Sequence, residues 1–195
     1  MLIPRPETET AVSAALEFIQ THPDANVCDL GTGSGAIALA IAANDPGARL
    51  TATDVSAKAL TIARRNIARF ELSSRIHIRA ADCYEPLDGM GPLGRFDLIV
   101  SNPPYIRDDE IAGLAPEICR YEPPIALAGG SDGLEFYRRI TAGLVRHLKR
   151  TGSAIVEIGA GQASVVNEIL RNAGATRVNV VSDLAGLSRV VVADF

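Results

Sequence analysis

The segment that most constrains the fold is a short apolar run that passes into a helix through three closely spaced glycines. Asn26–Leu30 has the length and character of a buried strand, and Ala36–Asn44 has that of a helix. The sequence Asp29-Leu30-Gly31-Thr32-Gly33-Ser34-Gly35 connects them. Glycines let the backbone pass close beneath a ligand, and a helix N-terminus offers free N–H groups. The same residues also suit a simple tight turn, so the motif needs support from the rest of the chain.

Strand-like and helix-like segments alternate along the whole sequence. We expect helices at 7–20, 36–44, 56–70, 134–148 and 162–173, and strands at 26–30, 49–53, 75–79, 96–100, 153–158, 177–181 and 189–192. This alternation predicts an α/β fold with a parallel, doubly wound sheet. The last two strands have only a turn around Gly186 between them, so we expect them to pair antiparallel. Residues 101–130 contain five of the 11 prolines and are interpreted as one long irregular, functional loop.

Acidic residues at strand ends indicate a nucleoside-containing ligand. Asp54 ends the second expected strand, where a carboxylate can accept both hydroxyls of a ribose. This position suits NAD or S-adenosylmethionine. The glycine spacing is G-x-G-x-G and not the G-x-G-x-x-G that seats a pyrophosphate, which favours S-adenosylmethionine. Asp82 follows the third strand and is placed either to read an adenine amino group or to form a turn, and Cys83 could line the adenine.

The motif Asn102-Pro103-Pro104-Tyr105 directly follows the fourth expected strand. An amide or aromatic amine nitrogen is a poor nucleophile because its lone pair is delocalised. Two acceptors on its N–H groups would orient it and stabilise the developing positive charge. The Asn102 side chain and the Pro103 carbonyl are such acceptors, and Tyr105 offers a flat face for a planar group. In isolation the four residues also fit a rigid turn with a core tyrosine.

Composition narrows the classes of function. The net charge is −4, from 19 basic and 23 acidic residues, which argues against direct nucleic-acid binding. The basic cluster of Arg64, Arg65 and Arg69 is interpreted as a solvated helix face. Three cysteines without zinc-ligand spacing predict neither a disulfide framework nor a metal site. The N-terminus has no signal-peptide pattern and no apolar run could span a membrane, so we expect a cytoplasmic protein.

From end to end the sequence resembles the bacterial peptide chain release factor glutamine methyltransferases, the HemK/PrmC family. The most specific segments are Arg5-Pro6-Glu7-Thr8-Glu9 and Tyr121-Glu122-Pro123. The resemblance implies a class I S-adenosylmethionine-dependent methyltransferase (Rossmann-like) fold with a seven-stranded, mostly parallel sheet and an antiparallel closing strand. It implies methyl transfer to the side-chain amide nitrogen (N5) of the glutamine in the Gly-Gly-Gln motif of release factors, which are the expected protein partners.

The expected site residues combine the motifs and the resemblance. Cofactor contacts are expected at Asp29, Gly31, Thr32, Gly33, Ser34, Gly35, Asp54, Asp82, Cys83 and Asn102. Substrate contacts are expected at Asn102, Pro103, Pro104 and Tyr105, with Asn102, Pro103 and Tyr105 as the catalytic residues.

The sequence departs from the family pattern in two respects, and several alternative functions stay open. Family members usually carry a small helical domain before the Arg-Pro-Glu-Thr-Glu segment, so residues 1–195 are expected to be a single catalytic domain without it. Cys83 stands where an aromatic often follows the acid, which leaves the adenine pocket undefined. The alternatives are a ribosomal-protein glutamine methyltransferase, a DNA or RNA adenine N6-methyltransferase, a nicotinamide-dependent oxidoreductase, and a module that binds the cofactor without turnover.

Overall fold

A seven-stranded sheet forms the centre of the computed structural model, which describes residues 3–85, 87 and 95–195. Met1 and Leu2 of the predicted domain 1–195 lie outside the described residues. The strand order is β3-β2-β1-β4-β5-β7-β6. The bounds are β1 Asn26–Leu30, β2 Arg49–Asp54, β3 Ile76–Ala80, β4 Phe96–Ser101, β5 Leu148–Glu157, β6 Arg177–Ser182 and β7 Ser188–Asp194. All neighbours pair parallel except at β7, which is antiparallel to both β5 and β6. The predicted fold class is confirmed.

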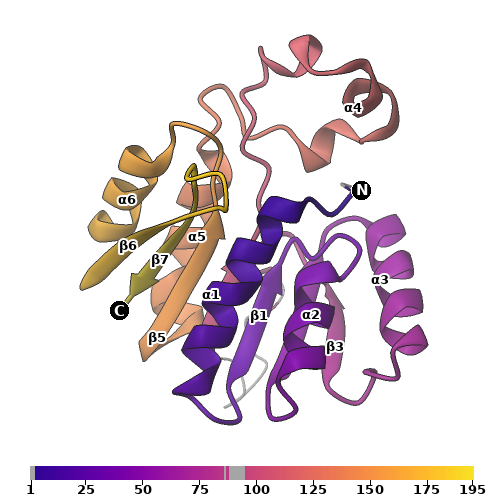
Figure 1. Cartoon of the computed structure of the whole chain (residues 1–195), viewed down its shortest axis with the longest axis vertical. Helices are drawn as coiled ribbons and strands as arrows, with labels where there is room; N and C mark the ends of the chain where they lie inside the picture. The colour runs from indigo at the N-terminus through magenta and orange to yellow at the C-terminus, as the bar shows by residue number, and fades with distance from the viewer. Residues whose placement is uncertain (1–2, 86, 88–94) are drawn as a thin grey trace.

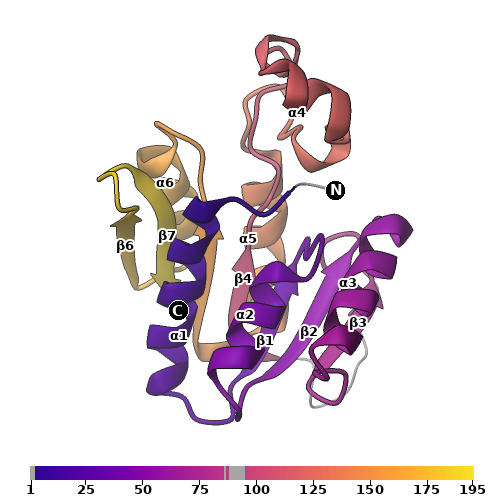
Figure 2. The ribbon, with the colours of Figure 1, turned by 45° about the vertical axis from the view of Figure 1, so that its right-hand side comes forward.

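Helices cover both faces of this sheet (Figures 1 and 2). One apolar cluster joins the sheet to α1 Glu9–Gln20, α2 Ala36–Asn44 and α3 Ala57–Arg69. The other joins it to α5 Glu135–His147 and α6 Ala163–Asn172. Ser56 caps α3, because its side chain accepts a hydrogen bond from the backbone N–H of Ala59. Coverage on both faces explains why the central strands β1 and β4 are almost entirely buried.

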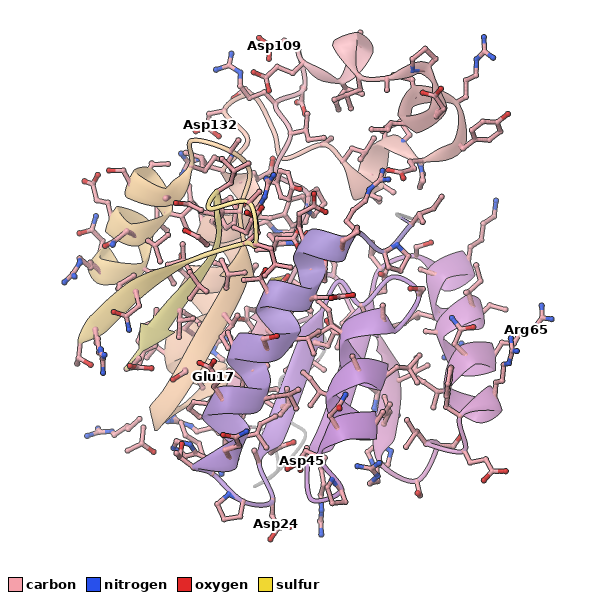
Figure 3. The ribbon with its side chains drawn as sticks, in the orientation of Figure 1. Glu17, Asp24, Asp45, Arg65, Asp109 and Asp132 are labelled. Atoms are coloured by element: carbon pink, nitrogen blue, oxygen red, sulfur yellow. The ribbon has the colours of Figure 1, made fainter. Side chains whose placement is uncertain are left out.

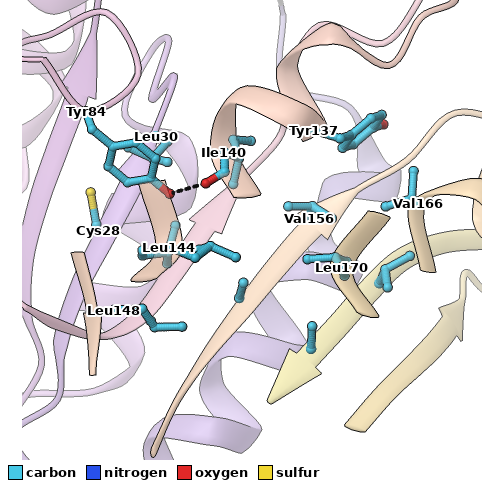
Figure 4. Packing of buried hydrophobic residues seen from close by; sticks show 14 of the residues in the cluster. Cys28, Leu30, Tyr84, Tyr137, Ile140, Leu144, Leu148, Val156, Val166 and Leu170 are labelled. Carbon is cyan, nitrogen blue, oxygen red and sulfur yellow. Dashed lines mark hydrogen bonds between the residues drawn. The ribbon is translucent and has the colours of Figure 1, made fainter. Parts of the chain in front are cut away.

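The core beneath α5 contains an aromatic anchor (Figure 4). The Tyr84 hydroxyl donates to the backbone carbonyl of Ile140 at 3.1 Å. The Tyr84 ring stacks on His147 with 4.5 Å between ring centroids. His147 is buried, so it is a structural residue, as the sequence suggested. This packing fixes α5 against the strand ends that carry the candidate site.

Two predicted boundaries differ from the structure. β5 begins at Leu148 and not at residue 153, because its first residues extend the strand towards the edge of the sheet. The stretch 101–130 is not wholly irregular, since it contains α4 Pro116–Tyr121 and the short 3-10 turns Ile111–Gly113 and Pro124–Ala126. Prolines are accepted in the first turn of a helix, and Pro116 begins α4 in this way.

Residues 107–128, here called the α4 arm, stand apart from the two helical layers above the carboxyl edge of the sheet (Figure 1). Hydrogen bonds close the base of the arm: the Ile106 N–H donates to Leu127 O at 2.9 Å, and the Gly129 N–H donates to Ile106 O at 2.7 Å. The arm therefore begins and ends at a fixed point next to the Asn-Pro-Pro-Tyr segment.

Charged side chains lie mainly on the outside of the molecule (Figure 3). Arg65 points outward from α3, and Arg64 and Arg69 are exposed on the same helix, as a solvated face requires. Among the helices of the described residues, none combines the length and apolar composition needed to cross a membrane. Within the same residues, no group of three or more His, Cys, Asp or Glu side chains is arranged to hold a metal ion.

Candidate functional site

The candidate site lies where the carboxyl ends of β1, β2 and β4 meet. Leu30 at the end of β1 pairs with Thr53 on one side and Ser101 on the other. The Ser101 hydroxyl donates to Leu30 O at 2.7 Å, which fastens the two strand ends together. The chain leaves β1 on one side and returns as β4 on the other, so this is the topological switch point at which open α/β sheets bind ligands. A cavity of about 290 Å³ opens there.

The glycine-rich loop forms the floor of this cavity. Gly31 and Gly35 have φ angles of 71° and 82°, which side chains other than glycine rarely adopt. A Cβ on Gly35 would also stand 3.4 Å from the Ala63 Cβ of α3. The Asn66 side chain donates to Ser34 O at 2.9 Å from the same helix. The loop therefore has one fixed conformation, with its backbone facing the cavity.

Asp29 supports the loop from behind and is not part of the cavity wall. Its Oδ2 accepts from the Thr32 hydroxyl at 2.6 Å and from the Ala38 N–H at 3.2 Å. Its Oδ1 is buried and has no hydrogen-bond partner among the described residues. Burial raises the pKa of Asp29 to about 6, against the hydrogen bonds, which lower it. A buried carboxylate with one unpaired oxygen favours a cationic group near the loop.

Asp54 presents its carboxylate to the cavity from the end of β2. Its Oδ2 accepts from the Gly33 N–H at 2.9 Å, and its Oδ1 accepts from the Ser56 N–H at 2.8 Å. Each carboxylate oxygen has a further acceptor site after these bonds. The backbone bonds fix the carboxylate between the glycine loop and α3, where it can accept a pair of ligand hydroxyls.

Asp82 and Cys83 line the same cavity beyond β3. The Asp82 Oδ1 accepts from Arg139 Nη2 at 2.5 Å, so this carboxylate is already partnered. The Cys83 backbone has a φ of 56°, and burial raises the pKa of its thiol to about 11. Cys83 is therefore a neutral, weakly polar part of the wall at neutral pH, which suits a flat ring more than an ion.

Asn102 is held from the N-terminal segment and from β5. Its Nδ2 donates to Thr8 Oγ1 at 3.1 Å, and the Thr8 hydroxyl donates to Glu157 Oε2 at 2.7 Å. Both Thr8 and Glu157 are buried. Burial raises the pKa of Glu157, while the hydrogen bonds from Thr8 and Asn102 lower it and so favour the carboxylate.

The direction of these bonds orients the Asn102 amide. A carboxylate can only accept, so the Thr8 proton goes to Glu157, and only the lone pairs of Thr8 remain for Asn102. Asn102 must then present its NH₂ group to Thr8, and its Oδ1 lies on the opposite side of the planar amide. The side chain therefore has an acceptor at the cavity wall, where Asn102 and Pro103 both lie.

Tyr105 does not line this cavity but a second one on the other side of the Asn-Pro-Pro-Tyr segment. Gln162 Nε2 donates to Tyr105 O at 3.0 Å, and a Cβ on Gly129 would come within 2.8 Å of the Tyr105 Cα. Burial, followed by the charge of Glu157, raises the pKa of Tyr105 to about 12. Its phenol is thus neutral, and its main chain is held firmly behind the two prolines.

The structure brings most of the predicted residues to one cavity. Its wall includes Gly31, Thr32, Gly33, Ser34, Asp54, Asp82, Cys83, Asn102, Pro103 and Pro104. Asp29, Gly35 and Tyr105 stand outside it, and their predicted contacts stay predictions. The sequence reasoning gave no individual role to Thr8, Glu157 or Gln162. One signal was available: Glu157 is an acid that directly follows the apolar run 154–156 at the end of β5.

Comparison with known proteins assigns the family. The family model described as "Methyltransferase small domain" matches residues 7–119. A release factor glutamine methyltransferase of Gloeobacter violaceus is 45% identical over 193 residues, covering 98% of this chain and 66% of the relative. A crystal structure of the release factor-specific protein-(glutamine-N5) methyltransferase of Alicyclobacillus acidocaldarius is 34% identical with a TM-score of 0.59, covering 98% of this chain and 93% of that one. The chain belongs to the release factor glutamine methyltransferase family.

The match to the curated relatives does not extend over their whole length. The chain spans about two thirds of the length of the curated relatives it matches. The fold also extends to distant proteins: the N-terminal domain of human METTL16 in complex with SAH has a TM-score of 0.68 at 19% identity, covering 100% of this chain and 72% of that one. At that identity the likeness concerns the fold alone.

Proposed function

We propose that this chain methylates the side-chain amide nitrogen (N5) of the glutamine in the Gly-Gly-Gln motif of peptide chain release factors, using S-adenosylmethionine. The family supports the reaction class, because its members carry this activity in their names. The proposed location of the protein is the cytoplasm, where it would meet a translation factor as its substrate. The product pair is an N-methylated glutamine and S-adenosylhomocysteine.

The observation that carries the proposal is the orientation of the Asn102 amide. The bond from Asn102 Nδ2 to Thr8 and the bond from Thr8 to Glu157 leave Oδ1 as the free acceptor. A primary amide substrate has two N–H groups, and the Pro103 carbonyl supplies a second acceptor beside Oδ1. Acceptors in this arrangement suit an –NH₂ group, which donates two hydrogen bonds, better than a hydroxyl, which donates one, or a thiolate, which donates none.

The cavity fits the proposed cofactor. Asp54 offers a carboxylate for the ribose hydroxyls, and the neutral wall at Cys83 suits the adenine. S-adenosylmethionine supplies a methyl group on a positively charged sulfur. The loop residues hold it in place, and the buried carboxylates Asp29 and Glu157 make this end of the sheet favourable for positive charge.

The residues around Asn102 act by positioning. The two acceptors turn the amide so that the nitrogen faces the methyl group, which allows an in-line displacement. When bound, S-adenosylmethionine would supply the methyl group: the nitrogen–carbon bond would form as the sulfur–carbon bond broke with its electrons going to sulfur, and the amide would then lose one proton to water. During transfer positive charge develops on the N–H groups, and Oδ1 and the Pro103 carbonyl stabilise it most strongly at that stage.

The direct test is methyl transfer from labelled S-adenosylmethionine to purified release factors, ribosomal protein and DNA assayed side by side. We expect label in the release factor alone, on the Gly-Gly-Gln glutamine by mass spectrometry. Asn102→Ala should lower kcat by about 10²–10³ with little change in S-adenosylhomocysteine affinity. Asn102→Asp retains an acceptor and should keep more activity than the alanine variant. Label in DNA or ribosomal protein only would refute the proposal.

A further inference from the structure

A second, smaller cavity lies on the far side of the Asn-Pro-Pro-Tyr segment from the first. Its volume is about 140 Å³. Asn102, Pro103 and Pro104 line both cavities, so this segment is the partition between them. The remaining wall comes from Arg5, from Tyr105 and Ile106, and from the α4 arm. Any group in the second cavity is therefore in contact with the residues that face the proposed acceptor nitrogen.

The second cavity contains a buried, half-satisfied carboxylate. Glu122 at the end of α4 is only 5% exposed. Its Oε1 accepts from Arg5 Nη2 at 2.7 Å. Its Oε2 is buried and has no hydrogen-bond partner among the described residues. A buried carboxylate oxygen without a donor is unfavourable, so it marks a place where an arriving N–H group gains a strong hydrogen bond.

The charge and size of the cavity define the ligand. Arg5 already balances the charge of Glu122, so a neutral N–H donor suits Oε2 better than a second cation. The volume is about half that of the first cavity, so the second cavity suits a smaller group. A short stretch of peptide backbone with small side chains fits both conditions.

We infer that Glu122 and this cavity form a subsite for the substrate backbone next to the methylated glutamine, in which Oε2 accepts a backbone N–H. This inference rests on the proposed function. The glutamine side chain would lie against Asn102 in the first cavity, and its neighbouring main chain would lie against Glu122 in the second. The α4 arm thereby reads the main chain of the substrate, and Arg5 holds the carboxylate in position from the N-terminal segment.

Glu122→Gln is the most informative substitution, because it keeps the shape of the side chain and removes one hydrogen-bond acceptor. Arg5 can only donate, so the glutamine oxygen turns towards Arg5 and an NH₂ group replaces Oε2. Loss of a hydrogen bond to a charged group should lower kcat/KM for a release factor by about 10- to 100-fold. The loss should lie mainly in KM. Affinity for S-adenosylhomocysteine, measured by calorimetry, should equal that of the parent.

Glu117→Gln is the matched control, since Glu117 is an exposed residue of the same short helix. A Glu122→Gln variant with the kcat/KM of this control would overturn the subsite. Methylation by the parent protein must be present in the same assay. If the parent does not methylate any release factor, the proposed function fails. If the parent is active and Glu122→Gln has the same kcat/KM as Glu117→Gln, only the subsite fails.

A substrate-side experiment does not depend on the folding of a variant. Synthetic peptides containing the target glutamine can replace one flanking backbone N–H at a time with an ester oxygen. Competition against methylation of the intact release factor by the parent protein gives an inhibition constant for each peptide. We expect one ester to weaken competition about tenfold or more and the others to have little effect. Equal competition by all the ester peptides and the parent peptide would overturn the inference.

Discussion

The Thr8 hydroxyl lies 2.7 Å from Oε2 of Glu157 and connects two residues that are 149 positions apart in the chain. Thr8 ends the 3-10 turn Pro6–Thr8, and Glu157 ends β5. This buried bond decides how Asn102 is oriented, because it uses the only proton of the Thr8 hydroxyl. The N-terminal segment therefore contributes a residue to the site.

Thr8→Val should lower kcat about tenfold or more, because valine has a similar shape but leaves Asn102 Nδ2 and Glu157 Oε2 without their partner. Thr8→Ser keeps the hydroxyl and should stay close to the parent. Cofactor affinity should change little in either variant, so a comparison of kcat with S-adenosylhomocysteine binding checks the prediction. Equal kcat values for the valine and serine variants would show that the hydroxyl does not position Asn102.

Asp54→Ala should weaken S-adenosylmethionine binding at least roughly tenfold, since a hydrogen bond to a charged group contributes on the order of 1.5–3 kcal/mol. Isothermal calorimetry measures this directly. Glu17→Ala, at an exposed position of α1, is the control and should bind as the parent does. Unchanged affinity in Asp54→Ala would remove this residue from the binding site, and tight NAD binding by the parent would overturn the cofactor itself.

Asp29→Asn should alter the pH dependence of stability. The pKa of Asp29 is raised from 3.8 to about 6, so the folded state binds this proton more tightly than the unfolded state. The resulting stabilisation is present below the unfolded pKa and is lost as the pH rises through about 6. The shift of about 2.2 units (6 minus 3.8) corresponds to about 3 kcal/mol.

Asparagine does not titrate, so the free energy of unfolding of Asp29→Asn should rise relative to the parent by about 2 kcal/mol between pH 4 and pH 7. Urea unfolding of both proteins at a series of pH values provides the measurement. A difference that is constant across this range would mean that Asp29 does not have a raised pKa.

The resemblance places a helical domain before the Arg-Pro-Glu-Thr-Glu segment. The curated relatives are longer, since this chain spans about two thirds of the Gloeobacter relative. Fusing the preceding domain of a relative should lower the KM for a whole release factor while cofactor affinity stays the same. A scrambled linker of equal length is the control. An unchanged KM would show that the domain contributes no substrate contacts.

The order of elements could be predicted from the sequence because apolar periodicity and glycine placement are local signals. Asp54 was placed at a strand end for this reason. The α4 helix was missed because the prolines of residues 101–130 resemble loop residues, although Pro116 begins a helix. The start of β5 was missed because residues 148–152 are mostly polar and exposed, and only pairing with neighbours extends the strand that far.

The sequence by itself determined the strand–loop–helix order, the glycine loop and the Asn-Pro-Pro-Tyr acceptors, because each is a property of neighbouring residues. Only the tertiary structure decided which residues support them. Thr8 and Glu157 reach Asn102 from segments that no periodicity connects, and Glu122 meets Arg5 because the α4 arm folds over the N-terminal segment. It also turned the Tyr105 side chain away from the cofactor cavity, since Gln162 and Gly129 fix the backbone there. Contacts of this kind depend on sheet order and close packing, which no short stretch of sequence encodes.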